Sequence, residues 1–273
     1  MKDGRIVSGK AFKPLLEKMS ETTPLHTLDP LNRFSDRATD YQRYRPSYPA
    51  AAIDKILSNL GDPTQLIAAD IGAGTGISAR LLSDRGLTVW AIEPNAAMSA
   101  ESKPYPRVAF RQATAEQTEL PNQSVDLITC FQSFHWFEPD ITLREFRRIL
   151  KPTGRLALVW NTRDRDDPFT QEYGELLRQA SNKHPALDKA FGRSESLPEN
   201  PYFPTFEEHH FALEHPLDLA GLIGNTKSRS YTPTSGELLD RLLQDLEALY
   251  QRNADDQGLI YIKYQTKVFI GGA

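Results

Sequence analysis

One short segment constrains the fold of this chain more than any other: an apolar run that ends in an acid and three closely spaced glycines. The segment spans residues 66–76 and reads LIAADIGAGTG. The apolar run is typical of a buried strand, and the glycines predict a loop whose backbone is not covered by side chains. In open α/β folds, ligands bind at the carboxyl ends of parallel strands. The segment therefore predicts a site for a bulky ligand at that edge of a sheet.

The spacing of the glycines separates two ligand classes. Dinucleotide-binding loops use Gly-x-Gly-x-x-Gly, with the pyrophosphate over a helix N-terminus. Here Gly76 comes one residue too early for that pattern, and Ile77 stands where the later glycine should be. Glu93, 17 residues after Gly76, follows a second predicted strand at 88–92. A carboxylate at that position can accept hydrogen bonds from two ribose hydroxyls.

Composition narrows the classes of protein. The 273 residues suffice for one large domain or two small ones with a sizeable core. The net charge of -4 and the lack of a basic cluster argue against a nucleic-acid or anionic-membrane partner. A single cysteine, Cys130, favours a reducing compartment, so we expect a cytoplasmic protein. We find no signal-peptide pattern and no apolar run near the roughly 20 residues of a membrane span.

Strand and helix patterns alternate up to residue 160. Strands are predicted at 66–70, 88–92, 107–112, 125–130 and 155–160, and helices at 49–59, 75–85, 95–102 and 140–150. Such βαβ alternation predicts an α/β fold with a doubly wound, mostly parallel sheet that is covered on both faces.

The pattern changes after Asn161. The charged, proline-containing segment 162–205 predicts an insertion that, with 217–255, caps the substrate side. Beyond it we expect a strand at 207–213, helices at 217–229 and 234–252, and a last strand at 260–270 on an antiparallel edge of the sheet. Residues 1–33 are interpreted as a partly disordered extension with a short helix at 11–19, and residues 34–273 as the main domain.

The chain resembles the class I S-adenosylmethionine (SAM)-dependent methyltransferases in five places. These are the glycine loop at 66–76, Glu93, QATAE at 112–116, CFQSFHWF at 130–137 and the Arg- and Tyr-rich run at 37–49. Gln132, His135 and Trp136 are most similar to the small-molecule branch (methyltransferase type 11), which includes the trans-aconitate methyltransferase-like proteins. The resemblance covers residues 34–160. It implies a Rossmann-like seven-stranded sheet, SAM as the cofactor and a small-molecule methyl acceptor.

The resemblance also assigns parts of the cofactor to these segments. Glu93 would hold the ribose, and the backbone at Gly72 and Gly74 the methionine end. Arg45 could fork onto the methionine carboxylate, and Glu116 either reaches the adenine or caps a turn. The implied cofactor residues are Tyr44, Arg45, Asp70, Gly72, Ala73, Gly74, Gly76, Glu93, Pro94, Met98, Thr114, Ala115, Glu116 and Gln132.

His135 is the implied catalytic residue. The pKa of a histidine suits a general base for a hydroxyl acceptor; the alternative is a histidine that orients its loop through a backbone hydrogen bond. A carboxylate acceptor would need a cationic clamp in place of a base. The residues implied on the substrate side are His135, Trp136, Trp160, Asn161, Arg229 and Tyr231.

Other functions are disfavoured by the sequence. FQSF at 131–134 replaces the Asn/Asp-Pro-Pro-Tyr/Phe-like motif of nucleobase amino-methyltransferases. No metal site is predicted, since the tandem His209 and His210 would point to opposite faces of a strand. We expect SAM-dependent methyl transfer to a small molecule, with a carboxylate or hydroxyl acceptor favoured. The alternatives are a non-catalytic sensor or partner subunit that binds SAM or S-adenosylhomocysteine (SAH), and, more weakly, a nucleotide-dependent oxidoreductase.

Overall fold

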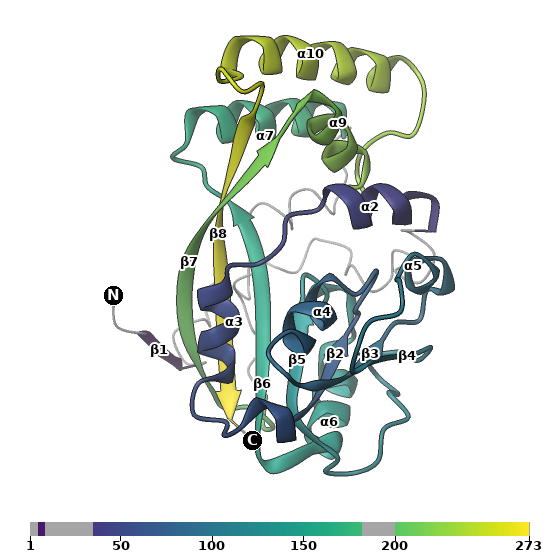
Figure 1. Cartoon of the computed structure of the whole chain (residues 1–273), viewed down its shortest axis with the longest axis vertical. Coiled ribbons are helices and arrows are strands. Elements are labelled where there is room, and N and C mark those ends of the chain that lie inside the picture. Colours follow the sequence, from purple (N-terminus) through teal and green to yellow (C-terminus); the bar gives the residue numbers. More distant parts are fainter. Residues whose placement is uncertain (1–4, 9–34, 182–199, 273) are drawn as a thin grey trace.

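A computed structural model describes residues 5–8, 35–181 and 200–272 of the chain. These residues form one mixed sheet with helices on both faces and a helical cap above one edge (Figure 1). The strands are β1 (Arg5–Ser8), β2 (Ile67–Ile71), β3 (Thr88–Ile92), β4 (Val108–Arg111), β5 (Val125–Phe131), β6 (Leu150–Arg163), β7 (Thr205–Leu217) and β8 (Ile260–Gly272). The α-helices are α2 (Ala38–Tyr44), α3 (Ala50–Leu57), α4 (Ile77–Ser83), α5 (Ala96–Ala100), α6 (Pro139–Ile149), α7 (Pro168–Ala180), α9 (Leu219–Lys227) and α10 (Glu237–Asn253).

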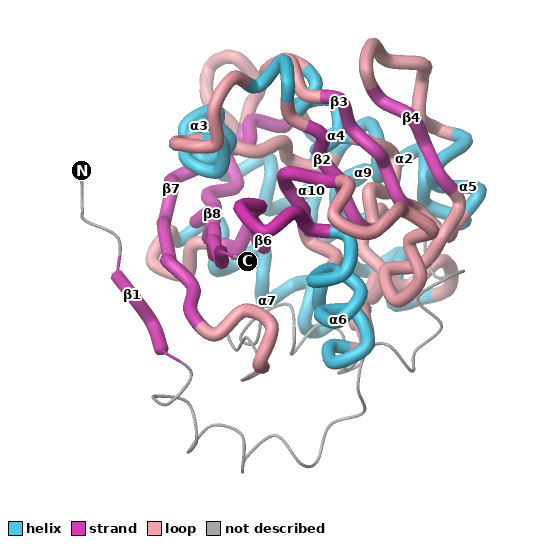
Figure 2. Tube along the Cα trace, turned by 90° about the horizontal axis from the view of Figure 1, so that it is seen from below, coloured by secondary structure: helices cyan, strands magenta, loops and turns pink. Residues whose placement is uncertain are grey.

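The sheet has the predicted doubly wound arrangement. Its order is β1-β7-β8-β6-β5-β2-β3-β4, and the five strands from β6 to β4 are parallel to one another. The chain runs outward from β2 to β4 and then returns to β5, so the switch point lies between β2 and β5. The α/β fold class is confirmed. The four residues of β1, from the N-terminal extension, add an eighth strand antiparallel to β7 at the outer edge (Figure 2).

The predicted edge position of the last strand is wrong. β8 lies between β6 and β7 and is antiparallel to both. The part of β8 from Ile260 to Lys267 alternates in burial, but Val268, Phe269 and Ile270 are buried in succession. The alternation that suggested an edge therefore reflects the part of the strand near the cap, whereas the other part is covered on both faces.

Helices bury both faces of the parallel strands. On one face α6 contributes Leu143 and Phe146, which pack with Ile128. On the other face α3 and α4 contribute Ile53 and Leu82 to a second apolar cluster. Because each central strand is covered on both faces, its sequence is mostly apolar, as in IAADI of β2 and VDLITCF of β5.

Side-chain caps set where the helices around the site begin. Asn95 accepts from the backbone N–H groups of α5, Glu138 from those of α6 and Asp218 from those of α9. Such caps satisfy backbone donors that have no partner inside the helix. The Asp218 cap also explains why the helix predicted from residue 217 begins later, since β7 continues through Leu217.

The cap stands on the long strands. β6, β7 and β8 extend beyond the rest of the sheet toward α7, α9 and α10 (Figure 1). These helices form a third apolar cluster with the first residues of β8. The cluster includes Leu222, Leu246 and Ile262. The described part of segment 162–205 contributes α7 to this cap. The helix predicted at 11–19 lies outside the described residues.

Helix α2 lies between the sheet and the cap, and the cap holds it (Figure 1). The Arg37 guanidinium donates to the backbone carbonyls of Lys227, Arg229 and Thr232. His215 Nε2 donates to the Tyr44 carbonyl at 3.0 Å. The Tyr44 ring packs against Gly224 of α9, where a Cβ would overlap the ring. The segment before the sheet therefore belongs, in its contacts, to the cap.

The contact between Tyr44 and Gly224 gives a first prediction. Gly224→Ala should lower the free energy of unfolding by about 1–3 kcal/mol, because the new methyl group forces the ring and α2 away from α9. Thermal or urea unfolding measures this loss. Gly272→Ala is the matched control, since a Cβ there meets nothing within 4 Å. Equal stability of the two variants would contradict this packing.

Candidate active site

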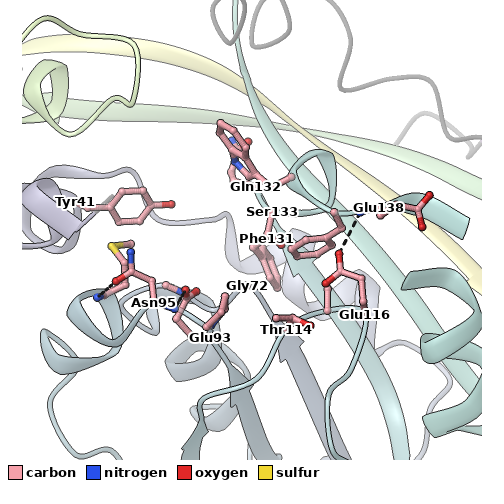
Figure 3. A pocket seen from close by; sticks show the side chains of 16 residues that line it. Tyr41, Gly72, Glu93, Asn95, Thr114, Glu116, Phe131, Gln132, Ser133 and Glu138 are labelled. Atoms are coloured by element: carbon pink, nitrogen blue, oxygen red, sulfur yellow. Dashed lines mark hydrogen bonds between the residues drawn. The ribbon is translucent and has the colours of Figure 1, made fainter. Parts of the chain in front are cut away.

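A cavity of about 400 Å³ opens at the carboxyl ends of β2, β3 and β5, beside the glycine loop. Figure 3 shows Tyr41 reaching toward it from α2, with Glu93 and Gly72 below and Thr114 and Glu116 opposite. The lining residues are Tyr41, Gly72, Gly74, Glu93, Pro94, Asn95, Met98, Thr114, Ala115, Glu116, Phe131, Gln132, Ser133, Trp136, Phe137 and Glu138. A second, small cavity of about 30 Å³ shares Tyr41, Gly72, Phe131 and Gln132 with it and adds Arg45, Pro46, Tyr48, Ala73, Ile77, Ser78 and Asn161.

Three positions of the glycine loop have a backbone conformation that favours glycine. Gly72, Gly74 and Gly76 have φ angles of 67°, 57° and 79°, in the left-handed region that favours glycine. A Cβ on Gly72 would lie 2.6 Å from the Cβ of Ser133 and 3.0 Å from the Phe137 ring. The loop therefore presents bare backbone to the cavity.

Glu93 joins this loop to the end of β3. Its carboxylate accepts from the Gly74 N–H at 2.7 Å through Oε2 and from the Asn95 N–H at 2.9 Å through Oε1. Burial raises the pKa of Glu93, and the two amide bonds oppose that rise. The side chain is 8% exposed and lines the cavity, so a ligand can reach its oxygens from one side.

Asp70 lies beneath the loop rather than in the cavity lining. It is fully buried, and its carboxylate accepts from Ser78 Oγ at 2.6 Å and Thr129 Oγ1 at 2.8 Å. Asp70 therefore ties β2 to α4 and β5. Burial raises its pKa to about 6, although the two hydroxyl bonds lower it.

The loop after β5 closes another side of the cavity. Gln132 has a φ of 57°, and its Nε2 donates to the Asn161 carbonyl at 2.9 Å. Ser133 Oγ donates to the Ile71 carbonyl at 2.6 Å. Glu116 accepts from the Glu138 N–H at 3.2 Å, so its carboxylate holds the start of α6 while it lines the cavity (Figure 3).

His135 lies on the same loop but outside the linings of both cavities. Its Nδ1 accepts from the indole Nε1–H of Trp160 at 3.2 Å. Trp160 is buried and packs edge-on against Phe269. A neutral imidazole with this bond carries its proton on Nε2. Trp136, the next residue, does line the cavity.

Arg229 and Tyr231 lie buried in the cap. Arg229 donates to the hydroxyls of Tyr173, Tyr231 and Tyr264. Asn161, by contrast, lies near the glycine loop, where its Oδ1 accepts from Thr266 Oγ1 and its Nδ2 donates to the Ser47 carbonyl.

The structure thus brings together most of the residues that the sequence singles out. The large cavity is lined by Gly72, Gly74, Glu93, Pro94, Met98, Thr114, Ala115, Glu116, Gln132 and Trp136, and the small one adds Arg45, Ala73 and Asn161. Outside both linings lie Tyr44, Asp70, Gly76, His135, Trp160, Arg229 and Tyr231.

Sequence reasoning missed Asn95, Ser133 and Glu138. Asn95 and Glu138 cap the N-termini of α5 and α6. The signal for them is their position directly before a predicted helix. Ser133 carries no such signal, because its role depends on a contact with β2.

Two further findings concern the described residues. None of their histidines, cysteines and carboxylates form a group of three or more that could hold a metal ion. In the same residues no helix is long and apolar enough to cross a membrane.

Comparison with known proteins identifies the family. A family model described as "Methyltransferase domain" matches residues 69–158. An uncharacterised methyltransferase of Mycobacterium bovis is 35% identical over 232 residues, which cover 83% of this chain and 90% of the relative. The chain belongs to the class I SAM-dependent methyltransferases.

Solved structures share the fold of this methyltransferase. One described as a type II methyltransferase from Anaeromyxobacter dehalogenans has a TM-score of 0.65 and 24% identity, and covers 84% of this chain and 98% of its own. A methyltransferase from an antibiotic biosynthesis pathway of Anabaena variabilis has a TM-score of 0.58 and 23% identity, and covers 83% and 98%. At these identities the likeness concerns the fold alone.

The residues of the cavity fit an adenosyl ligand. Gly72 and Gly74 line the cavity without side chains, and a carboxylate stands at the end of the second parallel strand. Met98, Phe131 and Phe137 supply apolar walls. Such a mixture of apolar walls and few polar groups is typical of sites for small molecules.

The buried Asp70 gives a second prediction. Its pKa is about 6 in the folded protein and near 3.8 as a free side chain. Between these two pH values the folded state therefore binds more protons than the unfolded state. Rising pH therefore destabilises the fold over this interval. Relative to wild type, Asp70→Asn should gain up to about 3 kcal/mol of unfolding free energy as pH rises from about 4 to 7.

Urea unfolding at several pH values measures that difference. Asp245→Asn, on an exposed position of α10, is the control for removal of a carboxylate. A wild-type-to-variant difference that stays constant with pH would contradict the assignment.

Proposed function

We propose that this methyltransferase transfers the methyl group of SAM to a small-molecule acceptor, with a carboxylate or hydroxyl as the favoured acceptor group. The observation that carries the proposal is the Glu93 carboxylate, which lines the large cavity while its oxygens are fixed by the Gly74 and Asn95 amides. An acid held in this way accepts hydrogen bonds from a pair of ribose hydroxyls with little reorganisation.

The other lining residues suit the remaining parts of SAM. Backbone at Gly72 and Gly74 would hold the methionine end of SAM. Arg45, which the resemblance assigns to the methionine carboxylate, lines the small cavity and donates to the Ser228 carbonyl of the cap. Thr114, Ala115 and Glu116 would border the adenine. Since Glu116 already accepts from the Glu138 N–H, it would act there mainly by fixing the loop.

When bound, SAM supplies an electrophilic methyl group. The chain contributes alignment of the acceptor and exclusion of water. Tyr41 lines both cavities from α2, and Gln132 borders both from the loop after β5. Because the cap holds α2, movement of the cap would open or close this side of the site.

The proposal extends to the bounds of the catalytic domain and to the cellular compartment. We propose residues 34–273 as the catalytic domain, with the described residues of 162–205 and 217–255 on the substrate side. The single cysteine, Cys130, is buried at the end of β5, which suits a reducing compartment such as the cytoplasm.

The cofactor assignment gives a third prediction. Glu93→Ala should weaken SAH binding about a hundredfold or more, because two charge-assisted hydrogen bonds to the ribose are lost. Calorimetric titration measures this, and Glu93→Gln tests whether charge as well as shape is needed. Glu214→Ala, on an exposed position of β7, is the control. Binding of NADH by the wild type, without binding of SAH, would refute the methyltransferase proposal.

The candidate base gives a fourth prediction. With a hydroxyl acceptor, His135→Ala should slow turnover about 10²- to 10⁴-fold and leave SAH affinity near that of wild type. With a carboxylate acceptor the same variant should keep its rate. The Trp160 indole holds the proton on Nε2, so a base role also requires that bond to open.

Transfer of labelled methyl from SAM to a metabolite mixture identifies the acceptor for this test. An unchanged rate with a verified hydroxyl acceptor would reject His135 as the base. Binding of SAH without any methyl transfer would favour the alternative of a sensor or partner subunit.

A further inference from the structure

A buried arginine in the cap is hydrogen-bonded to tyrosine hydroxyls, where a carboxylate would be the ordinary partner. Arg229 is 7% exposed, and it follows α9. Its Nη2 donates to Tyr264 at 3.0 Å, its Nε to Tyr173 at 3.3 Å and its Nη1 to Tyr231 at 3.4 Å. Three neutral hydroxyls satisfy the guanidinium but do not neutralise its charge. A buried charge without a counter-charge is costly.

Arg45 brings a second positive charge to the same place. From the end of α2, its Nη2 donates to the Ser228 carbonyl at 3.2 Å, next to Arg229 in the chain. Its guanidinium lies 4.7 Å from the centre of the Tyr41 ring. The Nε of Arg45 is buried and has no hydrogen-bond partner. This side chain therefore has unused donor capacity.

A third guanidinium borders the group. Arg163, at the end of β6, pairs in register with Tyr264 of β8. Its guanidinium lies 5.7 Å from the centre of the Tyr173 ring, and the Arg229 guanidinium lies 5.8 Å from the centre of the same ring. We name Arg45, Arg163, Arg229, Tyr173, Tyr231 and Tyr264 the arginine–tyrosine cluster.

The titration of neighbouring groups reflects this excess of positive charge. Burial raises the pKa of Tyr231, yet Arg163, Arg229 and Arg45 together lower it to about 8. Burial lowers the pKa of His215, and Arg229 and Arg45 lower it further. The largest charge effects on Arg45, Arg229 and Tyr231 come from arginines and tyrosines.

The cluster adjoins the proposed site of methyl transfer. Arg45 lines the small cavity together with Gln132 and Asn161, and Tyr41 lines both cavities. Arg163 is two residues beyond Asn161 on β6, about 7 Å farther along the strand. Arg45 therefore joins the cluster to the small cavity.

We propose that the arginine–tyrosine cluster is an anion subsite that binds a carboxylate or phosphate group of the methyl acceptor. This inference rests on the proposed function, because it places the acceptor beside the SAM cavity. The planar guanidinium groups of Arg45 and Arg229 suit such oxyanions. Arg229 lies in the cap, on the proposed substrate side, which favours the acceptor over the methionine carboxylate of SAM as the source of the anion.

The first arm of the test measures anion binding without the cofactor. Succinate is the anionic probe, and succinamide at equal ionic strength is its neutral counterpart. In an ultraviolet pH titration, one tyrosine of the wild type should ionise near pH 8, and succinate alone should shift that step upward. Tyr231→Phe should lack the step. Arg45→Gln should weaken succinate binding about tenfold or more.

Arg43→Gln is the matched control for Arg45→Gln. Arg43 lies on the same helix, and its guanidinium is 5.1 Å from the centre of the Tyr44 ring, but the side chain is exposed. Its succinate affinity should equal that of wild type. If folded wild type showed no response to succinate or to inorganic phosphate, the cluster would be packing of the cap and the proposal would be overturned.

The second arm separates the two sources of the anion. SAH and 5′-methylthioadenosine, which lacks the amino-acid end, are titrated into wild type and Arg45→Gln. Loss of SAH affinity with unchanged methylthioadenosine affinity would assign the cluster to the cofactor and overturn the proposal. Equal changes in both affinities, together with lost succinate binding, support it. Failure of wild type to bind SAH, with the succinate response intact, would refute the methyltransferase function and support the anion subsite alone.

Discussion

The site depends on one buried carboxylate that receives two backbone amides. Glu93 accepts from Gly74 in the loop after β2 and from Asn95 in the loop after β3. Without it, two buried N–H groups would have no partner. The glycine loop would keep only its backbone bonds from Gly72 and Ala73 to the Ile92 carbonyl of β3. Asn95 in turn caps α5, which carries Met98 to the cavity wall. Glu93 therefore joins the glycine cradle to the segment that begins α5.

The proposed substrate side is built differently, from parts far apart in the sequence. Arg37 and Arg45 donate to backbone carbonyls at the end of α9 and in the segment after it, and His215 of β7 donates to the Tyr44 carbonyl. Helix α2 and the C-terminal part of the chain thus form one unit around the arginine–tyrosine cluster. The proposed cofactor side rests on short loops at strand ends, whereas the proposed acceptor side rests on long-range contacts.

This difference explains what the sequence could predict. The strands at 67–71 and 88–92 follow from apolar runs, and Glu93 follows from its place at the end of the second one. Parallel strands bring such ends together, so local patterns predict the cavity floor. The position of β8 could not be read in this way, because strand order depends on pairing between residues more than a hundred apart. The phenol partners of Arg229 come from α7, β8 and its own segment, and no local pattern indicates them.

A crystal structure of the protein with SAH tests the central claim most directly. We predict that both ribose hydroxyls of SAH lie within hydrogen-bonding distance of the Glu93 carboxylate. We also predict the amino-acid end above Gly72 and Gly74, and the adenine beside Ala115. SAH bound elsewhere, or bound in this cavity with its ribose away from Glu93, would contradict the account.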